Sequence, residues 1–424
     1  MINNKEKKNI NLKKITASFI LASSILLTSC ENNNNLTETA TYNDENQELD
    51  KLLIKQEQLN KELATLFKQN KITNFRMTSY GNSIASGYSM VRTTKPLLLR
   101  NETLPNIMKE NNITLDVHHF ARAQNNNDER LFEWLVTNIK ESEIHKLNRN
   151  DYSDGKTSMT TNGLTPELLD KYYPLNIEND MGLQDIILEY NSNMANIVIY
   201  NGCTGSFLDN VTRNGKLTEK LTYGINRDTY GLEAILKYIQ TENRINNTNT
   251  QVYICGAPNF LGINISEIIN KKLKNIAEKY SNVNYIEPIK SKFFYEPINS
   301  EKDNKLKPDI HYNEEEYLEL NNNIIKSIID NYLITDAMIN IDRQFYHFSS
   351  NLEIENQDLI NNPDYVQSYI IQCLENESSK INDENIKKEF YKKIKEYLIS
   401  RTPYDFHYLK KNNINEAYEK VLTK

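Results

Sequence analysis

Five short apolar runs alternate with stretches of helical periodicity, and this alternation constrains the fold of the 424-residue chain more than any other feature. The runs are rich in β-branched and aromatic residues and span residues 73–80, 114–121, 196–201, 251–256 and 283–287. Strands separated by helices form parallel sheets, because a parallel pair needs a long crossover connection. The sequence therefore predicts an α/β fold, a doubly wound parallel sheet of about five strands with helices on both faces.

Two polar segments lie where such a sheet carries its chemistry. Gly81-Asn82-Ser83 directly follows the first run, and Asp309-Ile310-His311 precedes a helix expected to begin at residue 314. A serine hydroxyl becomes a nucleophile when a base takes its proton, and an acceptor must hold that base in one tautomer. In a doubly wound sheet, active residues gather beyond the carboxyl ends of the strands. Ser83, His311 and Asp309 are therefore the candidate catalytic residues.

These two segments resemble the first and last conserved blocks of the SGNH/GDSL hydrolases, which read Gly-Asp-Ser and Asp-x-His or Asp-x-x-His. The resemblance covers roughly residues 72–333. It implies a three-layer, flavodoxin-like sheet and an esterase activity. It also implies that Ser83 is the nucleophile, His311 the general base and Asp309 the residue that orients His311.

The two middle blocks depart from the family pattern. The second block normally supplies a glycine N–H to the oxyanion hole, but residues 115–124 contain no glycine, which leaves the backbone N–H of Ala123 or Gln124. In the third block Thr204 takes the place of an asparagine. The resemblance thus assigns the oxyanion hole to the N–H of Ser83, to Ala123 or Gln124, and to Thr204. Losing one oxyanion donor typically lowers a rate by about 100- to 1000-fold.

Two other enzyme folds have sequence patterns that this chain does not show. An α/β-hydrolase has Gly-x-Ser-x-Gly around its nucleophile, whereas residue 85 is alanine. A dinucleotide-binding fold has Gly-x-Gly-x-x-Gly after its first strand, and that pattern is missing as well. We therefore expect no nucleotide or other cofactor.

The first thirty residues are typical of an export signal. Five lysines precede an apolar stretch over residues 15–27, which is too short to span a membrane after export. The stretch ends in Leu27-Thr28-Ser29-Cys30, which resembles the lipobox of bacterial lipoproteins. The resemblance implies a signal peptide over residues 1–29, a lipid anchor on Cys30 and attachment to the outer face of the cell membrane. An ordinary secretion signal with an incidental cysteine is the alternative.

Charge and cysteine content exclude several partners. Removing residues 1–29 takes away five lysines and one glutamate, so the net charge changes from −7 to −11. An acidic chain is poorly suited to nucleic acid, because phosphate binding needs clustered Lys and Arg. His118 and His119 point to opposite faces of a strand, so no metal site is expected. Cys203 and Cys255 either pair or, more in keeping with an odd number of free cysteines, fill small buried apolar sites, as does Cys373.

The remaining segments define the expected domains. Residues 30–50 are Asn-, Thr- and Glu-rich and predict a disordered tether. Residues 51–334 form the hydrolase-like domain, with a packed N-terminal helix whose leucines and Phe67 recur between 47 and 70, and with an insertion near 141–180. Residues 335–424 predict a small helical appendage with two amphipathic helices. The first is marked by Tyr365, Ile370, Ile371 and Leu374, and the second by Ile386, Phe390, Ile394, Tyr397 and Leu398.

Two functions remain open at this point. The first is a surface-anchored serine esterase that hydrolyses acyl or acetyl esters of glycans or lipids. The second is a surface lipoprotein that keeps the fold, binds a ligand and has lost efficient catalysis, as the altered middle blocks suggest. The expected partners are an ester substrate and, through Cys30, the membrane.

Overall fold

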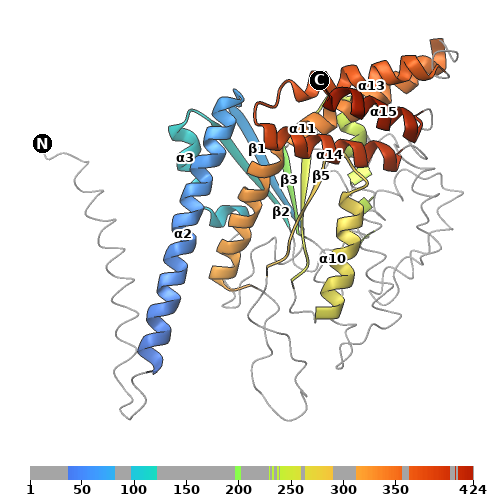
Figure 1. Ribbon diagram of the computed structural model, residues 1–424. Helices are drawn as coiled ribbons and strands as arrows, with labels where there is room; N and C mark the ends of the chain where they lie inside the picture. Colours follow the sequence, from blue (N-terminus) through green and yellow to red (C-terminus); the bar gives the residue numbers. More distant parts are fainter. Residues whose placement is uncertain are drawn as a thin grey trace, which may run out of the picture. The chain divides into compact units, whose positions relative to one another are not determined.

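The computed structural model describes residues 37–81, 97–121, 196–201, 229, 232–233, 236–237, 239–258, 263–289, 312–355, 362–401, 406 and 409–423 (Figure 1). The chain divides into two units, Met1–Lys51 and Leu52–Lys424. The sheet and all contacts discussed below belong to the second unit. The predicted signal peptide, Cys30 and the predicted insertion at 141–180 lie outside the described residues.

Five strands form one parallel sheet. They are β1 (Asn74–Gly81), β2 (Thr114–Ala121), β3 (Ile197–Asn201), β4 (Gln251–Cys255) and β5 (Val283–Ile286). Their order is β2-β1-β3-β4-β5, and every neighbouring pair is parallel. Each strand begins and ends within one residue of the run that predicted it, so the parallel α/β fold is confirmed. Strands β3 and β4 are buried along their whole length, which explains their continuous apolar sequence.

Helices cover both faces of the sheet. The Asn284 side chain of β5 donates to Thr335 Oγ1 of α11 (Glu314–Glu355) at 2.9 Å. The next residue, Tyr285, points to the opposite face. There Lys274 of α10 (Ile263–Ala277) lies 5.2 Å from the centre of the Tyr285 ring. The arrangement is therefore helix, sheet, helix, with α11 and α10 on opposite faces of β5.

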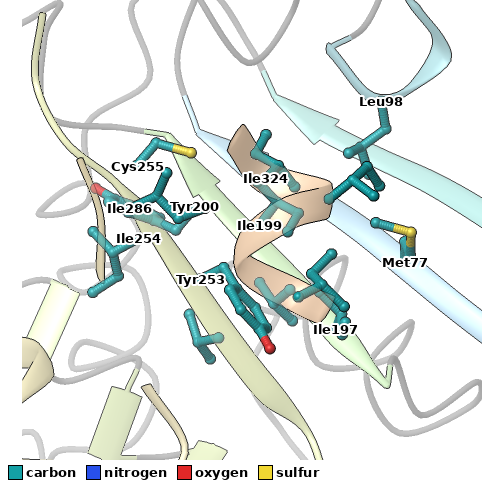
Figure 2. Close-up of a cluster of buried hydrophobic side chains, with 14 of the residues drawn as sticks. Met77, Leu98, Ile197, Ile199, Tyr200, Tyr253, Ile254, Cys255, Ile286 and Ile324 are labelled. Carbon is teal, nitrogen blue, oxygen red and sulfur yellow. The ribbon is translucent and has the colours of Figure 1, made fainter. Parts of the chain in front are cut away.

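The sheet core is the hydrophobic cluster between these layers. Figure 2 shows Met77, Ile197, Ile199 and Tyr253 from three adjacent strands together with Ile324 of α11, and all five are buried. The Gln251 amide of β4 also donates to the Tyr332 carbonyl oxygen of α11 at 2.9 Å. The core thus combines apolar packing with a few buried hydrogen bonds that fix the helix on the sheet.

The N-terminal helix α2 (Thr37–Gln69) packs on the sheet core through its second half. The Phe67 ring lies 4.1 Å from the Phe75 ring of β1, and the side chain of Asn60 donates to Asn101 Oδ1 at 2.8 Å. The expected packed helix is therefore present. Within the expected disordered tether over residues 30–50, the structure gives residues 37–50 as helical. Once a buried face has nucleated a helix, extending it into polar sequence costs little free energy, because each added residue gains one backbone hydrogen bond.

Two short helices lie between β1 and β2 in the sequence. The 3₁₀ helix η1 (Leu97–Arg100) lies beside α11, where the Asn321 amide donates to the Leu97 carbonyl oxygen at 3.0 Å. Helix α3 (Leu104–Glu110) follows and contacts β2. Both elements contribute buried leucines to the sheet core.

The C-terminal helices enclose a second hydrophobic cluster, the helical core. It lies among the C-terminal half of α11, α13 (Pro363–Ser378), α14 (Glu384–Arg401) and α15 (Lys411–Leu422). Helices α13 and α14 contain the two predicted amphipathic segments. The expected boundary at 334/335 falls inside α11, which runs unbroken through it. The side chains nevertheless change cores there, because Ile328 belongs to the sheet core and Ile334 to the helical core.

Candidate functional site

The carboxyl ends of three strands lie side by side at one edge of the sheet. In the pairing register, Gly81 at the end of β1 faces Ala121 of β2 on one side and Asn201 of β3 on the other. After β1 the chain forms β2 on one side of β1 and then β3 on its other side. The direction in which strands are added to the sheet therefore reverses between β1 and β3. Ligands of doubly wound sheets bind outside the carboxyl ends at this switch point. The edge formed by these three residues is the candidate site.

The residues that the sequence nominated lie outside the described residues: Ser83, Ala123, Gln124, Thr204, Asp309 and His311. The described chain ends two residues before Ser83 at Gly81, two before Ala123 at Ala121 and three before Thr204 at Asn201. It resumes at Tyr312, one residue after His311. The structure therefore describes the supports of the nominated segments and leaves their mutual geometry untested.

The start of α11 is fixed by a reciprocal cap. Asn313 Oδ1 accepts from the Glu316 backbone N–H at 2.8 Å, and Glu316 Oε2 accepts from the Asn313 backbone N–H at 2.9 Å. This capping box satisfies two N–H groups that a helix start leaves without intrahelical partners. Glu314, Glu315 and Glu316 also place negative charge in the first turn, where the helix dipole favours it. The cap of α11 is thus Asn313 and not the preceding Asp309.

Arg100 joins η1 to the first turns of α11. Its guanidinium forms an ion pair with Glu314 and lies 4.2 Å from the centre of the Tyr317 ring. The Arg100 side chain is 6% exposed, whereas that of Glu314 is 57% exposed. A planar guanidinium can pair with a carboxylate at its edge and stack on a ring with its face. Sequence reasoning did not identify this contact, because it joins residues far apart in the chain.

Tyr312 and Cys255 make the supporting layer beneath the edge neutral. Burial raises the pKa of the Cys255 thiol to about 12 and raises the pKa of Tyr312 well above its ordinary value, with the neighbouring Cys255 adding to the second shift. Both groups therefore stay protonated at neutral pH, and a protonated buried thiol is a poor nucleophile. Cys255 is free, so the prediction of a small buried apolar role is confirmed for it. Cys203 lies outside the described residues.

The chain leaving β4 is held close to the sheet. Asn270 of α10 accepts from the Ala257 N–H at 2.7 Å and donates to the Ala257 carbonyl oxygen at 2.9 Å. At Gly256, a Cβ atom would lie 2.8 Å from Cδ of Pro288 and closer still to the Tyr285 hydroxyl. Only glycine fits this approach between the ends of β4 and β5. This part of the edge is thus formed by closely packed backbone that Asn270 holds in place.

Two further polar residues lie in the described strands near this edge. Asn201, 3% exposed, ends β3 beside Gly81 and is the next oxyanion candidate after Thr204. Ser79 of β1 is fully buried, and its hydroxyl has no hydrogen-bond partner among the described residues. Only its position in the strand, two residues before Gly81, distinguishes Ser79 in the sequence.

The described residues contain no group of three or more His, Cys, Asp or Glu side chains arranged to hold a metal ion. Within the same residues, we find no helix with the length and apolar character that crossing a membrane requires. Comparison with known proteins adds no further assignment, since neither a protein-family model nor a curated protein matches the chain. The function must therefore be argued from the sequence blocks and from the edge that supports them.

Proposed function

We propose that the protein is a surface-anchored serine esterase of the SGNH/GDSL type that hydrolyses acyl or acetyl esters of glycans or lipids. Ser83 attacks the ester carbonyl, His311 takes the serine proton and returns it to the leaving alcohol, and Asp309 orients His311. The oxyanion is held by the Ser83 N–H, by the N–H of Ala123 or Gln124, and by the Thr204 hydroxyl. A lipid on Cys30 keeps the enzyme at the outer face of the membrane.

The observation that carries this proposal is the register row at the edge of the sheet. Ala121, Gly81 and Asn201 are adjacent in three neighbouring strands, in that order. The second, first and third sequence blocks begin within three residues of them. A residue spans at most about 3.6 Å of chain, so each block starts close to the same edge. A nucleophile in the segment after β1, with oxyanion donors in the segments after the two neighbouring strands, is an arrangement suited to ester hydrolysis.

The start of α11 supports the same assignment for the last block. A polar residue such as Asp ahead of a helix often serves as its cap, and this is the structural alternative to a catalytic role for Asp309 and His311. Asn313 and Glu316 already perform that task in α11. Tyr312, next to His311, is buried in the sheet core, and its phenol lies near the Cys255 thiol at the carboxyl end of β4. The cap of α11 therefore does not require Asp309 or His311, which supports the catalytic assignment of their block.

A serine-reactive fluorophosphonate probe tests the proposal on the folded, full-length protein. We expect labelling of the parent and hydrolysis of p-nitrophenyl acetate, and loss of both in Ser83→Ala. Ser79→Ala is the control, because it removes a buried β1 hydroxyl that has no hydrogen-bond partner in the described chain. It should keep full labelling. A well-folded parent that is neither labelled nor active contradicts the esterase.

The second candidate is a surface lipoprotein of the same fold that binds a ligand without efficient catalysis. Its basis is the absence of glycine from residues 115–124 together with Thr204 in place of asparagine. The same probe separates the two functions, since a binding protein that has lost its oxyanion hole remains folded and unlabelled.

A further inference from the structure

The Arg100 contact joins two described elements that follow, in the sequence, the segments of Ser83 and His311. Leu97 to Arg100 is the first described chain after the segment that contains Ser83. Glu314, its ion-pair partner, lies in the first turn of α11, three residues after His311. The amide of Asn321 adds a second link, because it donates to the Leu97 carbonyl oxygen at 3.0 Å. Two contacts, of which the Asn321 hydrogen bond is buried, therefore join η1 to α11.

Aromatic contacts extend this link into the sheet. The Tyr317 ring, on which Arg100 stacks, meets the Tyr312 ring edge to face, with centroids 5.5 Å apart and planes at 86°. Tyr312 is 1% exposed and belongs to the sheet core. Movement of Arg100 would thus disturb Tyr317 and Tyr312, and Tyr312 is bonded directly to His311. Edge-to-face ring pairs resist such movement because their attraction depends on orientation.

We propose that Arg100 is a positioning residue for the catalytic base. Its guanidinium, between the Glu314 carboxylate and the Tyr317 ring, holds the first turns of α11 against η1 and thereby positions the chain at His311. This inference rests on the proposed function for its catalytic consequence, although the placement of His311 by Arg100 can be measured without any activity. Small displacements matter here, since a misplacement of about 1 Å can lower a rate by about 100-fold.

A second arginine, Arg76 in strand β1, provides the comparison. Arg76, the third residue of β1, pairs with Asp116 of β2 at 2.5 Å, with side chains 19% and 44% exposed. The two arginines have similar partners and similar burial. They differ in place, because Arg76 lies toward the amino ends of the strands and Arg100 contacts the start of α11. Arg76→Ala is therefore the matched control for Arg100→Ala.

The first readout is hydrolysis of p-nitrophenyl acetate by the full-length protein. We expect Arg100→Ala to lower kcat by about ten- to a hundredfold with KM unchanged, and Arg76→Ala to change neither. Arg100→Lys should fall between, because an ammonium keeps the charge but not the planar stack. Glu314→Gln should resemble Arg100→Lys, since it removes the ion pair and leaves the ring contact. These two variants decide the question if Arg100→Ala does not fold.

The second readout is NMR of the histidine side chains, which does not require an active enzyme. The chain has six histidines, and the His311 signal is identified by its loss in His311→Gln. We expect Arg100→Ala to move the His311 signal while the others stay in place. An unchanged His311 signal and unchanged kcat in Arg100→Ala overturn the positioning role. A parent without esterase activity refutes the proposed function alone, because the His311 signal still reports whether Arg100 positions it.

Discussion

The sheet core and the helical core share helix α11, yet they are held together by different kinds of contact. In the sheet core, buried strands pack against α11 through Ile197, Ile199 and Tyr253 (Figure 2). The junction with the helical core is polar. Arg244 donates to both carboxylate oxygens of Asp342 on α11, at 2.7 and 2.8 Å, and these side chains are only 9% and 2% exposed. Apolar packing tolerates small shifts, whereas a bidentate ion pair accepts one geometry.

The junction extends beyond this pair. The Tyr397 hydroxyl of α14 donates to Asp342 Oδ1 at 2.5 Å, and the Gln240 amide donates to the Tyr397 oxygen at 3.0 Å. Arg343 of α11 donates to the Asn243 carbonyl oxygen at 2.7 Å. We call Gln240, Arg244, Asp342 and Tyr397 the Arg244 network. It joins the chain before β4 to α11 and α14, so the helical core is attached where the chain enters β4.

The largest expected effect comes from Asp342→Ala. Removing the carboxylate leaves the buried Arg244 without its ion-pair partner, which typically lowers the free energy of unfolding by about 3–5 kcal/mol. Urea denaturation measures this loss. Asp330→Ala is the control on the same helix, because Asp330 forms an exposed pair with Lys326 and should change stability by about 0.5 kcal/mol.

One buried free cysteine in each core shows whether the two cores unfold together. Cys255 lies in the sheet core and Cys373 in the helical core, and burial raises the pKa of each thiol to about 12. Pulse labelling with a thiol reagent during urea titration reports each core separately. We expect both cysteines to react at the same urea concentration in the parent, and Cys373 to react first in Asp342→Ala. Labelling that stays coincident in the variant shows that α11 and apolar contact suffice to couple the cores.

A pair of Tyr→Phe substitutions compares the two cores with the same chemical change. Tyr397→Phe removes a donor to a buried carboxylate and the acceptor of Gln240, so we expect a loss of about 2–3 kcal/mol in the free energy of unfolding. Tyr253→Phe removes a hydrogen bond of 2.9 Å between the neutral Tyr253 hydroxyl and Gln251 of the sheet core. The expected loss there is about 1 kcal/mol. Equal losses in the two variants would show that the network contributes no more than an ordinary buried hydrogen bond.

The contrast between the cores also explains what the sequence predicted. All five strands were predicted to within one residue, because each is a short segment rich in β-branched and aromatic residues, and β3 and β4, which are buried throughout, are also continuously apolar. The parallel direction of the strands was predicted from the helical segments between them. The amphipathic helices α13 and α14 were predicted for the same reason, since Phe390, Ile394 and Tyr397 recur at helical spacing. Burial of apolar side chains leaves a local signature, and local signatures can be read from one sequence.

The contacts that join elements left no such signature. Arg244 and Asp342 are 98 residues apart, and nothing near either one marks it as buried. Arg100 and Glu314 are 214 residues apart. The early start of α2 was missed because residues 37–50 have a polar composition that a solvated helix and a disordered tether share. For the candidate site, the sequence predicted the strands that end at the edge, and the nominated catalytic residues remain predictions.

The smallest expected effect concerns pH and a second polar contact between the cores. Asp336 of α11 accepts from the Asn249 side chain at 2.5 Å, and Glu377 of α13 and Lys380 also face it. Burial raises the pKa of Asp336 above its ordinary value of 3.8; the Asn249 hydrogen bond, Lys380 and Arg343 oppose the shift, and the Glu377 charge adds to it. A raised pKa means that the folded protein binds this proton more tightly than the unfolded chain does. Asp336 therefore favours the fold while protonated, and that contribution is lost as pH rises from about 4 through the raised pKa.

Asp336→Asn tests this direction, because an amide stays neutral and its oxygen can still accept from Asn249. Below about pH 4 the variant and the parent should have similar Tm values, since Asp336 is then protonated in both the folded and the unfolded parent. As pH rises toward 7 the variant should become the more stable protein, by a few degrees at most. Asp383→Asn is the control, because Asp383 accepts from the exposed N–H groups of Asn385 and Ile386 at the start of α14 and lies outside the junction. A Tm difference for Asp336→Asn that does not grow with pH would show that Lys380 and Arg343 compensate the buried carboxylate fully, and the junction would then be as insensitive to pH as the apolar sheet core.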